Sequence, residues 1–381
     1  MTSSIRDDDE VIARLEALHA PWRARLPDEV EAKYRKMAKD AFGYFRGTAP
    51  LFHDALQRER SPFIDDPERW LLLNGDVHLE NYGARRDAAG VAVFDLADFD
   101  EAAYGPVVHD IWRLATSLVL AARPRGLSDQ AIGEALHELA EHYGRALAAF
   151  AGDEAEPSQA RLTAADASGP IRKRIARLAK KSADELLVDI GRSDKWRAVP
   201  GERQPAFAAA LADYQQRLPG RQPALQLLDI HERLGAGNGS LGRHRYHLRV
   251  EAEDGGALVL EFKEQAPSAL HLAVTTRPEP LLPHHHGQRV AEAIRSLQSH
   301  PDARTGWTTL DGLPFLVREK SPFESSLDCD KLAGTRDWKT TARHTAQVLA
   351  KTHALRRRLM NRRFVFIKTS EMHLKNKMSE F

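Results

Sequence analysis

The sequence of 381 residues contains only one cysteine, Cys329. A single thiol cannot form an internal disulfide, and a chain of this length needs no such crosslink because it can bury a large hydrophobic core. The scarcity of cysteine therefore predicts a protein that folds in a reducing compartment.

An excess of charge of either sign is also missing, and so is a long apolar run. The 55 Lys and Arg residues nearly balance the 54 Asp and Glu residues, so no net field attracts nucleic acid or an anionic membrane. The longest apolar region, 107–122, includes His109, Asp110 and Arg113, which would be costly in hydrocarbon. Residues 1–10 are acidic and lack the apolar core of a signal peptide. We therefore expect a soluble, cytoplasmic protein with neither a membrane nor a nucleic-acid partner.

A basic amphipathic stretch at 171–181 departs from this balance. Its cations are compatible with a nucleic-acid or membrane helix, or with the lining of an acceptor pocket. We interpret it as the solvated face of a helix, because the protein as a whole is nearly neutral.

The most informative stretch is 74–81, Asn-Gly-Asp-Val-His-Leu-Glu-Asn. Asp76 and Asn81 have the five-residue offset of the catalytic loop of phosphoryl-transfer enzymes, in which the Asp takes the acceptor proton and the Asn holds a metal ion. His78 lies in the same loop and is a further candidate catalytic residue. Asp98, which precedes Phe99, has the position of the carboxylate that holds magnesium on the nucleotide phosphates. Asp95 is the alternative for that role.

Asp98 is favoured because Gly105 and Asp110 follow it, as in small-molecule kinases that resemble aminoglycoside and choline phosphotransferases. The competing interpretation is a β-hairpin, 82–99, which turns at 87–90 and whose carboxylates are only solvated. The spacing of the four polar residues favours the catalytic interpretation.

A glycine-rich segment, 234–242, precedes two predicted strands, the second of which carries Lys263. Glycines let backbone amides approach phosphates, and a strand lysine pairs with them. The candidate nucleotide-binding residues are therefore Gly235, Gly237, Gly239, Ser240, Gly242 and Lys263. A helix predicted at 288–298 carries Glu292, the candidate partner that orients Lys263.

In ordinary kinases the glycine-rich segment precedes the catalytic loop, whereas in this chain it follows the loop. This order is that of a circularly permuted kinase. Circular permutation is compatible with a compact fold. We therefore predict an α+β, bilobed, protein-kinase-like fold with permuted elements. It comprises a helical large lobe (1–220), a small antiparallel β lobe (221–325), and a final helix with a tail (326–381).

The chain resembles the bacterial family called domain of unknown function 2252, which is grouped with protein-kinase-like proteins. The resemblance rests on residues 45–47, 75–83, 98–101, 237–242, 263–264 and 289–292. It implies a kinase-like fold that uses adenine nucleotide and magnesium, but it implies no substrate. Asn74 stands where related kinases often have His, and Asp100 replaces the glycine after Asp-Phe; both bear on whether the site is active. The tail, 361–381, matches no known pattern.

The predicted function is a magnesium-dependent ATP phosphotransferase acting on a hydroxyl of a small molecule or protein. One alternative is a nucleotide-binding regulator without turnover. Another is a nucleotidyl transferase, in which the same pocket holds ATP inverted and transfers AMP.

Overall fold

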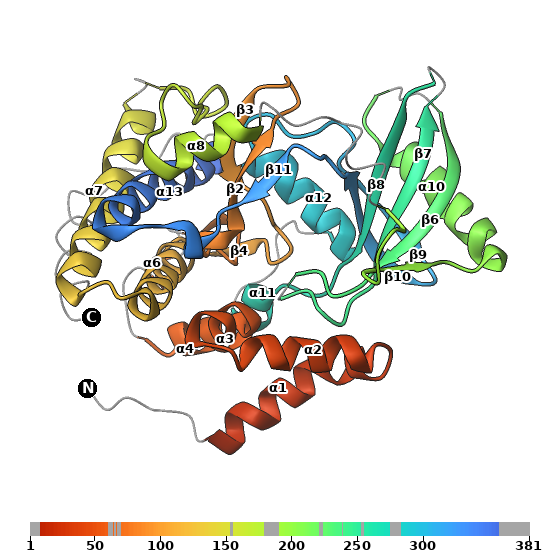
Figure 1. The fold of residues 1–381 in the computed structure, drawn as a ribbon, viewed down its shortest axis with the longest axis horizontal. Coiled ribbons are helices and arrows are strands. Elements are labelled where there is room, and N and C mark those ends of the chain that lie inside the picture. Colours follow the sequence, from red (N-terminus) through yellow and green to blue (C-terminus); the bar gives the residue numbers. More distant parts are fainter. Residues whose placement is uncertain are drawn as a thin grey trace.

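The computed structural model describes residues 8–59, 64, 66, 70–152, 155–178, 190–220, 224–237, 239–252, 255–274 and 283–357. Helices and antiparallel sheets build the molecule (Figure 1), which confirms the predicted α+β class. The tail at 361–381 and the end of the basic stretch at 179–181 lie outside the described residues. The predicted domain boundaries remain predictions.

The N-terminal region forms consecutive helices that lie along one side of the molecule (Figure 1). They are α1 (Asp8–Arg23), α2 (Pro27–Met37), α3 (Ala41–Gly47) and α4 (Ala49–Gln57). Pro27 begins α2, where its fixed φ suits a first helical residue. Asp40 caps α3, because its side chain accepts a hydrogen bond from the amide of Gly43 at 2.6 Å.

The larger sheet has six antiparallel strands in the order β5-β6-β7-β8-β10-β9. These are β5 (Trp196–Ala198), β6 (Leu225–Arg233), β7 (Arg245–Ala252), β8 (Ala257–Glu264), β10 (Leu313–Glu319) and β9 (Gly306–Leu310). Leu260 and Phe262 on β8 pack in a core with Phe207 of α10 (Gln204–Arg217), which covers one face of the sheet. Because side chains alternate along a strand, Glu261 and Lys263 are directed to the other face.

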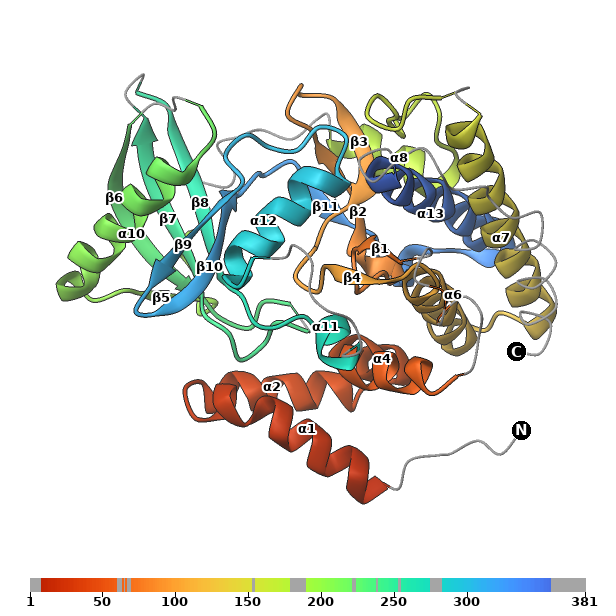
Figure 2. The ribbon, with the colours of Figure 1, turned by 180° about the vertical axis from the view of Figure 1, so that it is seen from behind.

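A separate core lies among the remaining helices and two small sheets. One sheet pairs β1 (Trp70–Leu73) with β4 (Ala103–Pro106), and the other has the order β11 (Glu324–Ser326), β2 (Tyr82–Arg86), β3 (Ala92–Leu96). The helices are α6 (Val108–Ala122), α7 (Asp129–Ala151), α8 (Gly169–Leu178) and α13 (Gly334–Arg357). Figure 2 shows α7 and α13 packed side by side, in agreement with their contacts. Ser128 caps α7 by accepting a hydrogen bond from the amide of Ala131 at 3.2 Å.

Helix α12 (His286–Leu297) joins the two cores. It packs on β9 and β10 of the larger sheet, while Val290, Ile294 and Leu297 are buried in the helix-rich core. Among the described residues, five short helices complete the fold. They are the 3₁₀ helices η2 (Leu79–Asn81), η3 (Arg123–Arg125), η4 (Gly201–Arg203) and η5 (Cys329–Lys331), and the α-helix α11 (Ala269–Ala273). The two cores therefore meet along α12, next to the face of the sheet that carries Lys263.

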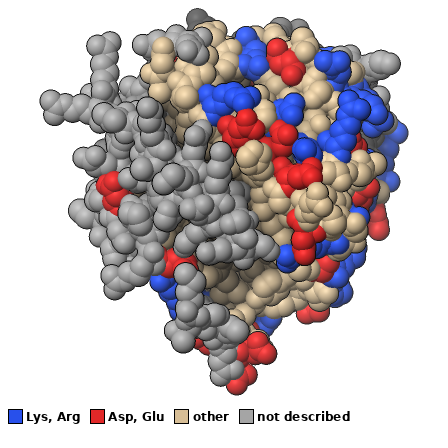
Figure 3. Space-filling model, turned by 90° about the vertical axis from the view of Figure 1, so that its left-hand side faces the viewer, with Lys and Arg blue, Asp and Glu red and all other residues tan. Residues whose placement is uncertain are grey.

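The basic stretch forms α8, whose apolar residues Ile171, Ile175 and Leu178 are buried. Arg174 donates a hydrogen bond to the hydroxyl of Ser325 at 2.7 Å. On the face of the molecule shown in Figure 3, positive and negative side chains are interspersed over the described surface. Among the described residues, no helix has the length and apolar character needed to cross a membrane.

Candidate functional site

A cleft of about 570 Å³ lies between the larger sheet and the helix-rich core. Its lining includes eight of the residues predicted from the sequence: Asp76, His78, Asn81, Asp98, Gly237, Gly239, Ser240 and Lys263. Gly235, Gly242 and Glu292 do not line it. The structure thus brings together most of the predicted site, from segments almost 190 residues apart in sequence.

The loop after β1 is held from behind by two buried residues. The Asp110 carboxylate accepts hydrogen bonds from the amides of Asn74 and Gly75, each at 2.9 Å. His53 donates from Nε2 to the Gly75 carbonyl at 2.8 Å. Gly75 has a φ of +82°, and a side chain there would collide with the Glu101 carbonyl oxygen, 2.0 Å from the Cβ position. Only glycine therefore lets this loop pack against the segment that follows Asp98.

Asp76 lies in the middle of this loop and is paired with a buried arginine. Arg113 donates from Nε to Oδ1 of Asp76 at 2.6 Å. The guanidinium lies over the Phe45 ring, 4.1 Å from its centroid, and also donates to the Phe45 carbonyl. Burial raises the pKa of Asp76 above its ordinary value, although the Arg113 guanidinium opposes this shift. Asp76 is therefore a stronger base than a solvated carboxylate, with one oxygen held in place.

His78 is nearly buried in the cleft wall. Its Nε2 atom lies 3.9 Å from Oδ2 of Asp76, and its ring meets the Phe42 ring edge to face. Burial and the nearby Arg46 guanidinium lower the pKa of His78 well below its ordinary value. A neutral imidazole beside Asp76 is suited to hydrogen bonding rather than to charge neutralisation.

The side chain of Asn81 connects the two acidic positions of the site. The Nδ2 atom of its side-chain amide donates to the backbone carbonyls of Asp76 and Asp98, at 2.9 and 3.0 Å. Its Oδ1 atom accepts a hydrogen bond from the Asp98 amide at 2.8 Å. Asn81 therefore fixes Asp76 and Asp98 relative to each other, and one lone pair of its oxygen is engaged.

Lys263 joins two carboxylates at the floor of the cleft. Its ammonium nitrogen lies 2.8 Å from oxygens of both Asp98 and Asp100. The Asp98 side chain is 50% exposed, whereas that of Asp100 is 7% exposed. Desolvation would raise the pKa of Asp98, but the Lys263 charge and hydrogen bonds lower it below the ordinary value. Burial and the Asp98 charge raise the pKa of Asp100. Asp98 is thus the ionised carboxylate that faces the cleft.

The predicted contact between Lys263 and Glu292 is not present. Glu292 accepts a hydrogen bond from Gln288 on its own helix at 2.8 Å, and the carboxylates near Lys263 are those of Asp98 and Asp100. Helix α12 contributes Arg289 instead, which donates to the backbone carbonyls of Ala102, Asp100 and Ala266. The reason is the rotation of α12, which sequence periodicity does not reveal. It directs Arg289 toward the Asp98–Ala102 segment and Glu292 along the helix.

Three residues of the glycine-rich segment, 234–242, contribute to the cleft. Gly237, Gly239 and Ser240 line the cleft, and the Ser240 hydroxyl accepts a hydrogen bond from Arg245 at 3.1 Å. The amides of these three residues donate no hydrogen bond to another described residue. Backbone amides that face a cleft and donate to no described residue are suited to binding an anion. Gly242 packs against α1 and α2 instead.

Sequence reasoning did not assign a role to several residues that hold the site together. Arg113 and His53 fall within helices, and the charge of Arg113 inside an apolar run was the available signal. Asp95, the alternative to Asp98, does not line the cleft. It is buried and pairs with Lys351 at 2.8 Å and Arg85 at 3.2 Å.

The donor set of the cleft is compatible with magnesium that also binds phosphate. The described residues contain no group of three or more His, Cys, Asp or Glu side chains able to hold a metal ion by themselves. Magnesium commonly takes one or two carboxylates and completes its shell with water and substrate phosphates. The half-exposed Asp98 carboxylate and the remaining lone pair of Asn81 Oδ1 fit that pattern.

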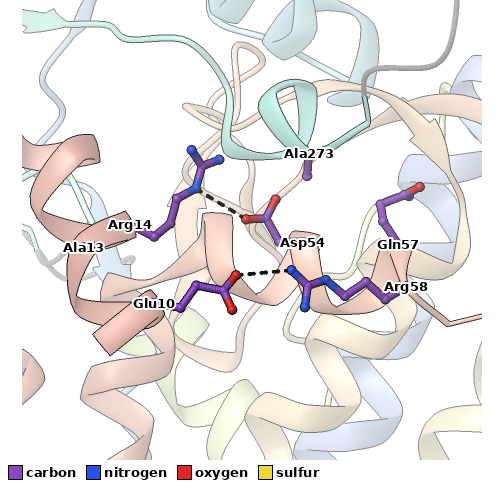
Figure 4. Close-up of a pocket in the computed structure, with 7 residues that line it drawn as sticks. All are labelled: Glu10, Ala13, Arg14, Asp54, Gln57, Arg58 and Ala273. Carbon is purple, nitrogen blue, oxygen red and sulfur yellow. Dashed lines mark ion pairs between the residues drawn. The ribbon is translucent and has the colours of Figure 1, made fainter. Parts of the chain in front are cut away.

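A second depression, of about 520 Å³, lies between α1, α4 and α11 (Figure 4). Its charged side chains pair with one another, Arg14 with Asp54 and Glu10 with Arg58, each at 3.5 Å. It contains none of the residues predicted from the sequence. We therefore take the cleft at Asp76 and Lys263 as the candidate site.

Comparison with known proteins gives a single family. A family model described as an uncharacterized protein conserved in bacteria (DUF2252) matches residues 25–376. No curated protein and no solved structure matches the chain. The match includes every residue of the cleft described above, and the chain belongs to the DUF2252 family.

Proposed function

We propose that the protein is a magnesium-dependent phosphotransferase that uses ATP and acts on a hydroxyl of a small molecule or protein. The observation that carries this proposal is the composition of one cleft. A potential base (Asp76), an ionised carboxylate held by a lysine (Asp98 and Lys263), and glycine-rich-segment residues whose amides donate to no other described residue all line it. Phosphoryl transfer needs this combination, because its catalysis consists mainly of positioning and electrostatic stabilisation.

Each residue has a role in the proposed reaction. Asp76 accepts the proton of the acceptor hydroxyl, a role favoured by its raised pKa. Lys263 and the amides of Gly237, Gly239 and Ser240 bind the phosphates of ATP. Asp98 and Asn81 are the residues that would hold magnesium, which neutralises charge on the phosphate oxygens. Arg113 and Asn81 orient the two carboxylates.

The proposal includes a protein-kinase-like fold with circularly permuted elements. The order of elements along the chain in the larger sheet supports this fold. A glycine-rich connection joins β6 to β7, the next strand carries Lys263, and α12 follows. Protein kinases build their phosphate-covering lobe in that order. The hairpin β2–β3 separates Asn81 from Asp98, as expected between a catalytic loop and a metal-binding Asp.

One observation favours a nucleotide-binding regulator without turnover. An active protein kinase pairs its strand lysine with a helix glutamate, but Lys263 pairs with Asp98 and Asp100. Under this alternative, Asp76→Asn would leave nucleotide binding and cellular activity intact. Under the phosphotransferase proposal, the same substitution removes the base and abolishes turnover.

The test is a titration of the purified protein with ATP, with and without magnesium, followed by identification of the nucleotide products. Saturable, magnesium-dependent binding with ADP release supports phosphoryl transfer, and Asp98→Ala should abolish it. Formation of pyrophosphate with AMP transfer would replace the proposal by nucleotidyl transfer. Absence of binding up to millimolar ATP would contradict any nucleotide-dependent function.

A further inference from the structure

Helix α2 contacts the glycine-rich segment from outside the cleft. Lys33 donates a hydrogen bond from its ammonium to the carbonyl of Gly239 at 2.6 Å. Lys36 donates to the carbonyls of Gly235 and Gly237 at 3.1 and 2.8 Å. Neither lysine lines the cleft, whereas Gly237 and Gly239 do. The carbonyls of the segment are therefore bonded by groups that lie behind it.

Helices α1 and α2 also contact the two ends of the glycine-rich segment. The Glu29 carboxylate accepts a hydrogen bond from the amide of Gly235 at 3.0 Å. Gly242 has a φ of +93°, and a Cβ there would lie 2.9 Å from Val30 and 3.0 Å from Trp22. The beginning, middle and end of the segment thus contact the α1–α2 hairpin.

The geometry of the peptide bond makes these contacts relevant to ligand binding. In a trans peptide the C=O and the following N–H point in opposite directions. Because the Gly239 carbonyl is bonded to Lys33, the Ser240 amide is directed away from α2. Ser240 lines the cleft, and its amide donates no hydrogen bond to another described residue. Holding the carbonyl on one side therefore presents a donor on the other.

We propose that α2 positions the glycine-rich segment for an anionic ligand, with Lys33 and Lys36 as positioning residues that hold its carbonyls away from the cleft. The identity of the ligand as a nucleotide phosphate rests on the proposed function, whereas the ordering of the segment by α2 does not. Lys33 and Lys36 act through the backbone and do not touch the phosphates.

Lys33 is suited to a substitution that leaves the fold intact. The residue is 2% exposed, and burial together with the Arg243 charge lowers its pKa to about 7. A buried ammonium is costly to desolvate, so replacing it with the unbranched, apolar methionine removes that cost along with the hydrogen bond. Lys33→Met should therefore retain or raise the melting temperature.

The experiment compares wild type, Lys33→Met, Lys36→Met and the control Arg35→Met. Arg35 is on the same helix, but its side chain is 66% exposed and pairs with Glu31. The first readout is the NMR order parameter of the Gly237 and Gly239 amides in nucleotide-free, 15N-glycine-labelled protein. The second is the dissociation constant for ATP without magnesium and for inorganic tripolyphosphate.

We expect order parameters near 0.85 in wild type and Arg35→Met, falling below about 0.6 in both lysine variants. Both probes should bind the lysine variants roughly tenfold more weakly, because the segment must be ordered again on binding. Unchanged order parameters would overturn the ordering role of α2. Mobile glycines with unchanged or tighter probe binding would overturn the positioning role. If wild type binds neither probe, the proposed function and the anionic ligand fail together, while the order parameters still decide whether α2 orders the segment.

Discussion

Arg113 and Asp76 form an ion pair of 2.6 Å between two segments 37 residues apart, and the Arg113 side chain is completely buried. Lysine could not reproduce these three contacts, because the planar guanidinium bonds Asp76 and the Phe45 carbonyl while lying over the Phe45 ring. The pair sets both the position and the basicity of the proposed catalytic carboxylate.

Arg113→Met should reduce the free energy of unfolding by about 2–4 kcal/mol, because it leaves Asp76 without its counter-charge. The pKa of Asp76 should rise further, so that the folded state binds a proton at higher pH than the unfolded state does. Stability relative to wild type should therefore fall as pH rises from 5 to 7. Urea unfolding at pH 5 and pH 7 measures the difference in unfolding free energy between wild type and Arg113→Met. Arg145→Gln, which changes an exposed arginine, is the control. A pH-independent loss of stability would contradict the assigned coupling.

Asp98→Ala and Asp95→Ala should have opposite effects on function and stability. Asp98 is half-exposed, and Lys263 retains Asp100 as a partner, so its loss should abolish magnesium-dependent ATP binding at little cost in stability. Asp95 pairs with buried Lys351, and breaking this pair should cost about 3–5 kcal/mol. Isothermal titration and thermal unfolding of the two variants provide the comparison. Retained magnesium dependence in Asp98→Ala would remove Asp98 from the proposed metal site.

Gly75→Ala and Gly90→Ala separate the cost of a positive φ from the cost of a collision. Both glycines have a φ near +80°, but a Cβ at Gly90 has nothing within 4 Å, whereas one at Gly75 lies 2.0 Å from the Glu101 carbonyl. We expect Gly90→Ala to cost about 1 kcal/mol and Gly75→Ala more than about 3 kcal/mol. Denaturant unfolding measures both values. Equal costs would show that the loop moves away from Glu101 without penalty.

His109 should make the protein sensitive to acid. Gln57 donates to its Nε2 atom at 2.8 Å, and its Nδ1 atom lies 2.9 Å from Nδ1 of His53. His53 donates from its other nitrogen to the Gly75 carbonyl. Its Nδ1 atom must therefore accept the hydrogen bond from His109, so this chain of hydrogen bonds requires both rings to be neutral. Burial lowers the pKa of His109 to about 4.

Because unfolded His109 takes up its proton near pH 6.5, the unfolded state binds more protons than the folded state between pH 6.5 and 4. Stability should therefore fall as pH decreases through this window, by up to about 3 kcal/mol from this residue. His109→Gln should flatten the acid limb of a stability profile, whereas substitution of the exposed His137 by glutamine should not. An unchanged acid limb in His109→Gln would contradict the prediction.

Several features of the site could be predicted because they depend on neighbours along the chain. The offset between Asp76 and Asn81 spans one loop, and the side chain of Asn81 bonds the backbone at both ends of the hairpin that follows. The alternating pattern of β8 directs Lys263 away from the apolar core. The hairpin offered as the competing interpretation is also present, with Asp87 and Val91 bonded across its turn. The two interpretations are compatible, because the polar residues lie just beyond the strand ends.

The failures concern residues whose partners are distant in sequence. The expected pair of Glu292 and Lys263 does not form, because the rotation of α12 about its axis is set by Val290, Ile294 and Leu297 packing into the helix-rich core. That packing places Arg289 against the Asp98–Ala102 segment. Helical periodicity identifies an apolar face, but it does not say which polar residue beside that face meets the cleft.

The sequence by itself determined the family, the α+β class, and most of the residues of the 74–81 loop and the Lys263 strand that line the cleft, because local spacing and strand alternation carry that information. Only the tertiary structure decided that Arg113 holds Asp76, that Asp98 rather than Asp95 faces the cleft, and that α2 bonds the glycine-rich segment. Hydrogen bonds and ion pairs between distant segments depend on the burial and relative orientation of whole elements. Those quantities are settled when the cores pack, and no short stretch of sequence contains them.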